Sequence, residues 1–241
     1  MSARIQPSSS IDDVELSVPV ATVVARFPSS SRVFERHRID YCCRGGESLA
    51  AAAVSRGLDP DALLAELRTM PVQVDAGVGF DRAAASMSEL CDLIERTHHA
   101  FLRQELPRAR ELCARVVRAH GDRHPEVRRV AELLATFHEE LESHMRKEEV
   151  VLFPLLRSFE RGDARAGLSP DGPIDCMMRE HDDAGATLAR LRGLTSDFTP
   201  PTDACPTFRA LYDSLASIER DMHTHVHTEN WILFPKARFE G

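Results

Sequence analysis

Two long segments of the chain carry apolar residues at alternating steps of three and four, the spacing that places side chains on one face of an amphipathic helix. The first segment follows this pattern at Leu134, Phe137, Leu141, His144, Glu148, Val151 and Leu155. The second follows it at Leu211, Leu215, Ile218, Met222, His225, Glu229 and Ile232. Both patterns predict a helix with a buried apolar face, and in both a His-x-x-x-Glu pair lies on that face.

The two segments belong to a longer internal repeat. Leu-Phe-Pro closes each of them, and a single histidine precedes each His-x-x-x-Glu pair at nearly the same distance along the chain. These two histidines are His99 and His181. We therefore expect a duplicated helical hairpin, in which each copy supplies one histidine from its first helix and the pair from its second.

Breaks in the pattern predict the ends of four helices. Ser86 or Ser88 begins the first helix, and Gly121–Pro125 forms the turn into the second. The loop Gly162–Pro173 precedes the third helix, and Thr199–Pro206, which contains three prolines, precedes the fourth. Four long helices with short connections predict an up-down-up-down bundle.

A smaller all-α domain is expected before the bundle. Ser48 and Asp59 have the N-cap positions of two of its short helices. Residues 71–80 show no sustained period and contain Pro and Gly, which predicts a linker. The predicted organisation is thus a helical domain over 1–70, the linker, and a four-helix bundle over 81–241.

The composition narrows the classes of partner. The 241 residues are 43% hydrophobic and 28% charged, as in an ordinary globular protein. The formal net charge of −8 argues against a nucleic-acid partner or an anionic membrane surface. No window is apolar for long enough to cross a bilayer, and the N-terminus has no signal-peptide pattern, so we expect a cytoplasmic protein. The oligomeric state stays open, a homodimer included.

Donor side chains on the buried faces predict a metal centre. A buried imidazole or carboxylate is costly unless it is paired or bound. The six candidates are His99, His144, Glu148, His181, His225 and Glu229. This set is too large for one tetrahedral zinc and lacks the thiolates of a structural zinc site. If each Glu bridges, two metal ions receive two histidines and two carboxylate oxygens each, with room for an oxo or hydroxo bridge. The ligand type favours iron, with manganese second.

Periodicity leaves some neighbouring histidines open. His98 continues the face upstream of it, whereas His99 fits the face downstream. His223 and His227 lie about 200° round the helix from His225, which predicts that water surrounds them.

Two glutamates near the candidate ligands are also ambiguous. Glu140 lies one turn before His144, and Glu180 directly precedes His181. Either carboxylate could orient a ligand from outside the metal centre or line a path for iron, and a merely solvated role fits equally well.

The order H…HxxxE…H…HxxxE resembles hemerythrin-like four-helix bundles. The segments THHAFLRQELP, HMRKEEVVLFP, REHDDAG and HVHTENWILFP resemble the di-iron proteins of the repair-of-iron-centres family. The N-terminal segment DYCCRGG is similar to that family's small domain, which has a vicinal cysteine pair before Gly-Gly, although Arg44 departs from the pattern. The resemblance implies a hemerythrin-like fold and two iron ions, and it selects His99 over His98 as the ligand.

Cys42 and Cys43 allow two interpretations. They could be ordinary thiols in a turn, because adjacent cysteines rarely suit the geometry of a disulfide. An exposed pair in a Gly-rich turn is better placed for exchange with a partner thiol or for transient contact with a metal. The resemblance favours this redox or transfer role.

The resemblance also implies a function. It suggests a stress-response protein that restores iron-sulfur centres damaged by nitric oxide or peroxide, with damaged iron-sulfur proteins as partners. Iron donation is favoured over classical enzymatic turnover. The alternatives are a sensor that binds NO or O₂ and a di-iron NO reductase or peroxidase, and the same ligand set would serve all three.

Overall fold

The computed structural model describes residues 10–70, 81–163 and 169–239, and the regular elements within these ranges are all helical. The chain divides into two compact units, Met1–Ala85 and Ser86–Gly241. The predicted all-α class is therefore confirmed. The expected linker at 71–80 lies outside the described residues.

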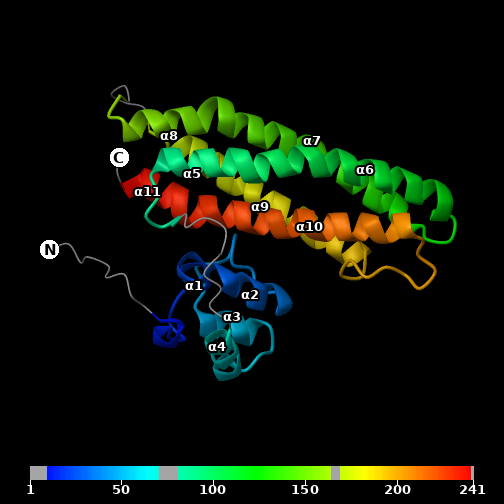
Figure 1. Ribbon diagram of the computed structural model, residues 1–241, viewed down its shortest axis with the longest axis horizontal. Helices are drawn as coiled ribbons and strands as arrows, with labels where there is room; N and C mark the ends of the chain where they lie inside the picture. Colours follow the sequence, from blue (N-terminus) through cyan, green and yellow to red (C-terminus); the bar gives the residue numbers. More distant parts are fainter. Residues whose placement is uncertain (1–9, 71–80, 164–168, 240–241) are drawn as a thin grey trace. The chain divides into compact units, whose positions relative to one another are not determined.

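Short helices form the N-terminal unit (Figure 1). They are η1 (Ile11–Asp13), α1 (Val20–Arg26), η2 (Pro28–Ser30), α2 (Ser31–Arg36), α3 (Leu49–Ser55) and α4 (Pro60–Thr69). The predicted caps are present, since the Ser48 side chain accepts from the backbone N–H of Ala51 and the Asp59 side chain from that of Asp61. These caps satisfy N–H groups that the first turn of a helix leaves unpaired.

The second unit is a bundle of long helical rods that lie side by side (Figure 1). The first rod is α5 (Met87–Ile94), η3 (Glu95–His99) and α6 (Ala100–His120); the second is α7 (Glu126–Lys147), η4 (Glu148–Leu152) and α8 (Phe153–Glu160). The third is α9 (Asp171–Leu194), and the fourth is α10 (Pro206–Thr228), η5 (Glu229–Leu233) and α11 (Phe234–Phe239). Helix α6 packs against α7 and α10, and α7 packs against α9. The predicted four-helix bundle is confirmed.

Local signals in the sequence explain where the rods begin. Ser86, and not Ser88, caps α5, in a capping box with Glu89. Pro206 begins α10, as a residue without a backbone N–H can at the first helical position. Helix α9 begins at Asp171, two residues before the predicted start at Pro173. None of the helices in the described residues combines the length and the apolar character that a membrane span requires.

The predicted buried face of the second rod is wrong beyond Glu148. Val151 is 53% exposed, whereas its neighbour Leu152 is 1% exposed. The reason is the π-helical turn η4, whose i→i+5 hydrogen bonds add one residue to the turn and rotate the following face by one position. The same shift leaves Leu155 half-buried and places Leu156 in the core.

A second π-helical turn, η3, explains why periodicity could not choose between His98 and His99. The turn spans Glu95–His99, so the buried face changes register at these two residues. Both side chains point inward, with His98 at 5% and His99 at 0% exposure.

The expectation that water surrounds His223 and His227 is wrong for His227. His227 is only 4% exposed, and His223 is half-buried. At the end of α10 the consecutive residues 225–228 are all buried, so this part of the helix has no solvated face. A helical-wheel argument assumes such a face and therefore fails here.

The register shift in η4 predicts opposite effects for two adjacent residues. Leu152→Ala should lower the free energy of unfolding by about 2–5 kcal/mol, because it leaves a cavity in a packed core. Val151→Ala should change it by less than about 0.5 kcal/mol, because the side chain is exposed. Denaturant unfolding of the metal-free chain measures both. A larger loss for Val151→Ala would show that the apolar face continues without the shift.

Candidate metal centre

Six side chains that the sequence predicts as metal ligands lie together inside the bundle, and none is more than 3% exposed. Within the described residues they form two overlapping groups, in each of which the donor atoms lie within 4.8 Å of one another. The first group is His99, Glu148, His225 and Glu229, and the second group is His144, Glu148, His181 and Glu229. Each group combines two imidazoles with two carboxylates.

Glu148 and Glu229 belong to both groups, and each directs its two oxygens at different histidines. The distances are 3.2 Å from Glu148 Oε2 to His99 Nε2, 3.4 Å from Glu148 Oε1 to His144 Nε2, 3.2 Å from Glu229 Oε1 to His225 Nε2 and 3.1 Å from Glu229 Oε2 to His181 Nε2. Each carboxylate can therefore serve both groups at once, as a bridging ligand does.

Several donor atoms at the centre lack hydrogen bonds. Both oxygens of Glu148, Oε2 of Glu229 and Nε2 of His99 are buried without a hydrogen-bond partner among the described residues. Buried polar atoms are normally satisfied, because leaving them unpaired costs free energy. A cation between them would remove this cost, so the residues present fit a metal centre.

Charge in the metal-free chain leads to the same conclusion. Burial alone would lower the pKa of His99, but the carboxylates of Glu148, Glu229 and Glu149 outweigh it and raise that pKa. Burial likewise opposes the rise in the pKa of His181, which Glu229 produces. The two buried carboxylates thus draw positive charge to the centre. Metal binding there would displace protons from imidazoles and weaken as the pH falls.

Three of the four histidines donate from Nδ1 to an acceptor outside the centre. The hydrogen bonds run from His99 to Glu149 (2.7 Å), from His144 to Glu180 (2.9 Å) and from His181 to Asn230 Oδ1 (2.8 Å). Once its Nε2 proton is displaced, a ring that donates from Nδ1 offers its Nε2 lone pair to a metal, and these Nε2 atoms face the shared glutamates. Such outer acceptors orient metal-binding histidines and increase their basicity.

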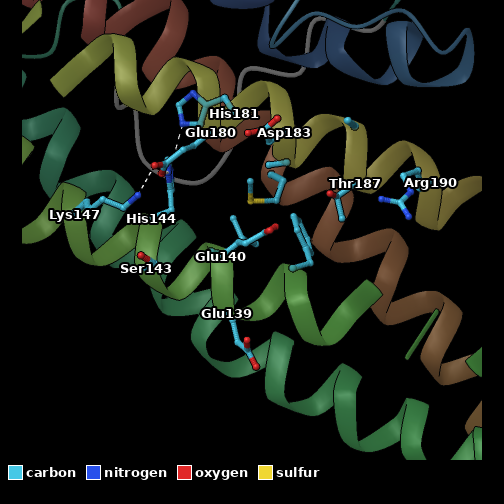
Figure 2. Close-up of a pocket in the computed structure, with 15 residues that line it drawn as sticks. Glu139, Glu140, Ser143, His144, Lys147, Glu180, His181, Asp183, Thr187 and Arg190 are labelled. Carbon is cyan, nitrogen blue, oxygen red and sulfur yellow. Dashed lines mark hydrogen bonds and ion pairs between the residues drawn. The ribbon is translucent and has the colours of Figure 1, made fainter. Parts of the chain in front are cut away.

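Basic side chains hold the two outer carboxylates. Glu180 lies between His144 and Lys147 and pairs with both (Figure 2). The hydrogen bond from His144, together with Lys147, lowers the pKa of Glu180 to about 2. For Glu149, burial opposes a lower pKa, but Arg103 at 2.8 Å and His99 outweigh it. Both acceptors are therefore ionised at neutral pH.

His225 differs from the other three histidines. Its Nδ1 is buried without a hydrogen-bond partner among the described residues, and its ring stacks on His98 with centroids 5.2 Å apart and planes 1° apart. Burial lowers the pKa of His225 to about 4, so the ring is neutral. His98 is itself held by Asp221, at 2.8 Å from its Nδ1.

The internal repeat explains this difference. Glu180, which binds His144, directly precedes His181, and the residue that directly precedes His99 in the other copy is His98. A stacked imidazole therefore replaces a hydrogen-bonded carboxylate in one half of the centre. The repeat could also have revealed two acceptors that sequence reasoning missed, because Glu149 and Asn230 each directly follow a shared glutamate.

A cavity of about 620 Å³ between α7 and α9 reaches His144 and His181 (Figure 2). Glu140, for which an orienting role, an iron path and a solvated side chain all stayed open, is exposed on the wall of this cavity. Among the described residues Glu140 accepts no hydrogen bond from the four histidines of the centre, whereas Glu180 accepts one from His144. The cavity therefore borders one side of the centre.

The cysteine pair in the N-terminal unit is less exposed than expected. Cys42 is only 5% exposed and Cys43 is half-buried, because Asp40 Oδ1 folds the turn by accepting hydrogen bonds from both backbone N–H groups. The sulfurs are 3.8 Å apart and are not joined in a disulfide. Gly45 is required in this turn, since a Cβ there would lie 2.4 Å from the carbonyl oxygen of Tyr41.

The turn also contains a third group of donor atoms. Asp40, Cys42 and Cys43 each offer a ligand atom within 4.8 Å of the others. The hydrogen bond with Cys43, followed by burial, raises the pKa of Cys42 well above its usual value, so Cys42 is a thiol. Cys43 is the more accessible sulfur of the pair.

Comparison with known proteins gives matches over both units. Residues 94–237 match the hemerythrin HHE cation binding domain, and residues 16–70 match ScdA_N, a domain of unknown function (DUF542). The chain is 36% identical over 219 residues to the iron-sulfur cluster repair protein YtfE of Enterobacter sp. (strain 638), covering 91% of this chain and 96% of that protein. The proteins of the same name from Citrobacter koseri and Escherichia coli O81 (strain ED1a) are 35% identical over the same shares.

The hydrogen bond from His144 to Glu180 predicts that Glu180→Ala weakens metal binding by about 10–100-fold, because the imidazole loses its orienting acceptor. Glu140→Ala is the matched control, since it removes the same charge from the same cavity wall without touching a histidine. Competition with a chelator measures both affinities. Equal losses in the two variants would show that only the charge of the cavity matters.

Proposed function

Since the chain belongs to the iron-sulfur cluster repair family, we propose that its bundle holds two iron ions and restores iron-sulfur centres damaged by nitrosative or oxidative stress. The observation that carries the proposal is the pair of overlapping groups, in which two buried glutamates are shared by four histidines. The matches over both units confirm the family resemblance that the sequence shows.

The donor set suits iron. It contains imidazole nitrogens and carboxylate oxygens without a thiolate, a combination that iron accepts and that a structural zinc site rarely uses. Each position would have four protein ligands, His99 and His225 in one and His144 and His181 in the other, with the two glutamates common to both. Iron bound there would supply a redox-active metal that can be released for rebuilding a cluster.

The surrounding residues hold the donors in place. The ion pair of Arg103 with Glu149 fixes the acceptor of His99, and that of Lys147 with Glu180 fixes the acceptor of His144. The six donors are nearly inaccessible to water, so water cannot stabilise the negative charge of the two glutamates. This arrangement favours a bound cation while the histidines keep their orientation.

The two positions are not equivalent, which supports iron donation. Both histidines of the His144 and His181 position have an outer acceptor, whereas His225 at the other position stacks on His98 instead. An imidazole without an acceptor is the weaker ligand. The iron at the His99 and His225 position is therefore the one that the protein would give up first.

The cysteines and the cavity bear on the proposed compartment, clients and small ligands. None of the six cysteines, each within the described residues, forms a disulfide, as expected in a reducing cytoplasm. The proposed clients are damaged iron-sulfur proteins. The cavity between α7 and α9 would admit NO or O₂ as small ligands.

A gas sensor and a di-iron NO reductase or peroxidase remain the alternatives. Both would use the same donors, but both would retain their iron during function. Release of iron therefore separates them from the repair protein.

Inequivalent positions predict iron loss in two kinetic phases. The reduced, iron-loaded protein should lose iron to a chelator faster than the oxidised protein, because ferrous iron carries less charge to balance the two glutamates. Glu180→Ala should accelerate the slow phase and leave the fast phase unchanged, since Glu180 supports only the His144 position. Absorbance of the chelator complex follows both phases. A single phase, or equal loss in both redox states, contradicts this proposal.

Reactivation of a client tests the proposed function directly. The iron-loaded protein should restore activity to an iron-sulfur dehydratase damaged by nitric oxide, and the metal-free protein should not. Free ferrous iron at equal concentration is the control. If it works equally well, or if the protein retains its iron throughout, a sensor or a turnover enzyme is the better account.

The same assay tests the cysteine pair, for which we propose a transfer role. Cys42→Ser combined with Cys43→Ser should leave the iron content unchanged, because neither residue belongs to the two groups in the bundle. It should nevertheless slow reactivation of the damaged dehydratase. Lost iron would assign the pair to the metal centre, and full activity would make it structural.

A further inference from the structure

A fifth histidine, outside the two donor groups, has the surroundings of a metal ligand. His98 is 5% exposed, and its Nδ1 lies 2.8 Å from Oδ1 of Asp221 on α10. An ionised carboxylate only accepts hydrogen bonds, so His98 donates from Nδ1. Its Nε2 is buried and has no hydrogen-bond partner among the described residues. An outer acceptor on Nδ1 and an unpaired Nε2 are the arrangement that prepares a histidine for a metal.

His98 adjoins one of the two metal positions. Its ring stacks on that of His225, with centroids 5.2 Å apart and planes 1° apart. It also directly precedes His99, the other histidine of this position, and both side chains point inward from the π-helical turn η3. His98 is therefore in contact with the position that would give up its iron first.

Asp221 supplies a second unpaired donor atom. Its Oδ1 accepts from His98, but its Oδ2 is buried without a hydrogen-bond partner in the described part of the chain. Buried polar atoms are normally hydrogen-bonded, because an unpaired one costs free energy. The two unpaired atoms are an imidazole nitrogen and a carboxylate oxygen. These are the ligand types that the metal centre itself offers.

The exposure of these donors increases with distance from the centre. His225 has no exposed surface, His98 is 5% exposed, and the side chain of Asp221 is 18% exposed. Neither His98 nor Asp221 lines the cavity between α7 and α9. The pair thus leads from the His225 side of the centre toward solvent between η3 and α10, apart from that cavity.

The internal repeat places donors at the same points in both copies. Asp221 and Glu140 each lie one turn before a ligand histidine, and His98 and Glu180 each directly precede one. Glu140 and Glu180 line the cavity that reaches His144. Donor side chains therefore flank both metal positions. Only the pair of His98 and Asp221 combines an imidazole with a carboxylate.

We propose that His98 and Asp221 form a transfer site that passes ferrous iron between the His99 and His225 position and solvent. This inference rests on the proposed function, because it gives a route to the iron that is released first. His98 Nε2 binds the ion as His225 Nε2 releases it, so one donor bond forms while another breaks and the oxidation state stays the same. Any proton on Nε2 leaves to water. Asp221 Oδ2 is the second ligand of the transfer site.

The rates of iron loss and iron loading test the transfer site. A side chain that assists only the passage of an ion changes both rates by the same factor, because their ratio is the affinity. His98→Phe keeps an aromatic ring beside His225 and removes both nitrogens. It should slow the fast phase of iron loss to a chelator by about tenfold, slow loading by the same factor and leave the dissociation constant unchanged. Timed desalting of the reduced protein followed by iron analysis measures loading.

A second variant and two controls keep the test independent of packing. Asp221→Asn keeps an oxygen that can accept from His98 but removes the charge, and it should slow both rates in the same direction. Asp213→Asn is its matched control, at an exposed aspartate two turns earlier on the same helix. His120→Phe is the matched control for His98→Phe, because it replaces another buried histidine, which packs against Phe208 with centroids 5.3 Å apart.

The slow phase, from the His144 and His181 position, should be the same in all four variants. The transfer site is overturned if His98→Phe and Asp221→Asn lose and gain iron at the wild-type rates. It is equally overturned if they change the dissociation constant instead. The residues would then stabilise the bound state, as a water molecule buried among their unpaired atoms would.

The wild-type protein separates this inference from the proposed function. If it holds no iron, or loses its iron in a single phase, the proposed function fails and the transfer site fails with it. Two phases in the wild-type protein, with the same rates in His98→Phe and Asp221→Asn, reject the transfer site alone.

Discussion

The candidate metal centre depends on the burial of two carboxylates among four imidazoles. Glu148 and Glu229 have no exposed surface, and each faces one histidine from either group. Buried negative charge of this kind is stable only when a positive charge lies beside it. In the metal-free chain protons on the histidines serve this purpose, and a pair of cations would serve it better. The hydrogen bonds to Glu149, Glu180 and Asn230 support this charge balance, because they orient three of the histidines toward the shared glutamates.

The π-helical turns connect the fold to this centre. Each of the three turns in the described bundle has a donor at one end, since His99 ends η3, Glu148 begins η4 and Glu229 begins η5. π-helical turns are rare in proteins as a whole but frequent at functional sites. They redirect side chains at the expense of regular α-helical hydrogen bonds. The centre therefore determines where the helices depart from the α-helical period. The apolar pattern predicts the rods well up to these turns and assigns Val151 to the wrong face just beyond one.

Much of the candidate site was predictable because the chain repeats itself. The repeated His-x-x-x-Glu pairs and the matching lone histidines pointed to the six side chains that the structure brings together. The stacking of His98 on His225 was not predictable, because it depends on two rods meeting in space. The burial of Cys42 was missed for a similar reason, since it follows from hydrogen bonds to Asp40 and not from any periodic pattern. Sequence periods describe the faces of single helices, whereas these features arise from tertiary contacts.

The central claim is that Glu148 and Glu229 each serve two metal positions at once. Crystals of the iron-loaded protein, with diffraction measured on either side of the iron absorption edge, test it most directly. The account predicts two anomalous peaks per chain, one beside His99 and His225 and one beside His144 and His181, with both glutamates in contact with each. A single peak, or peaks away from these residues, would contradict it.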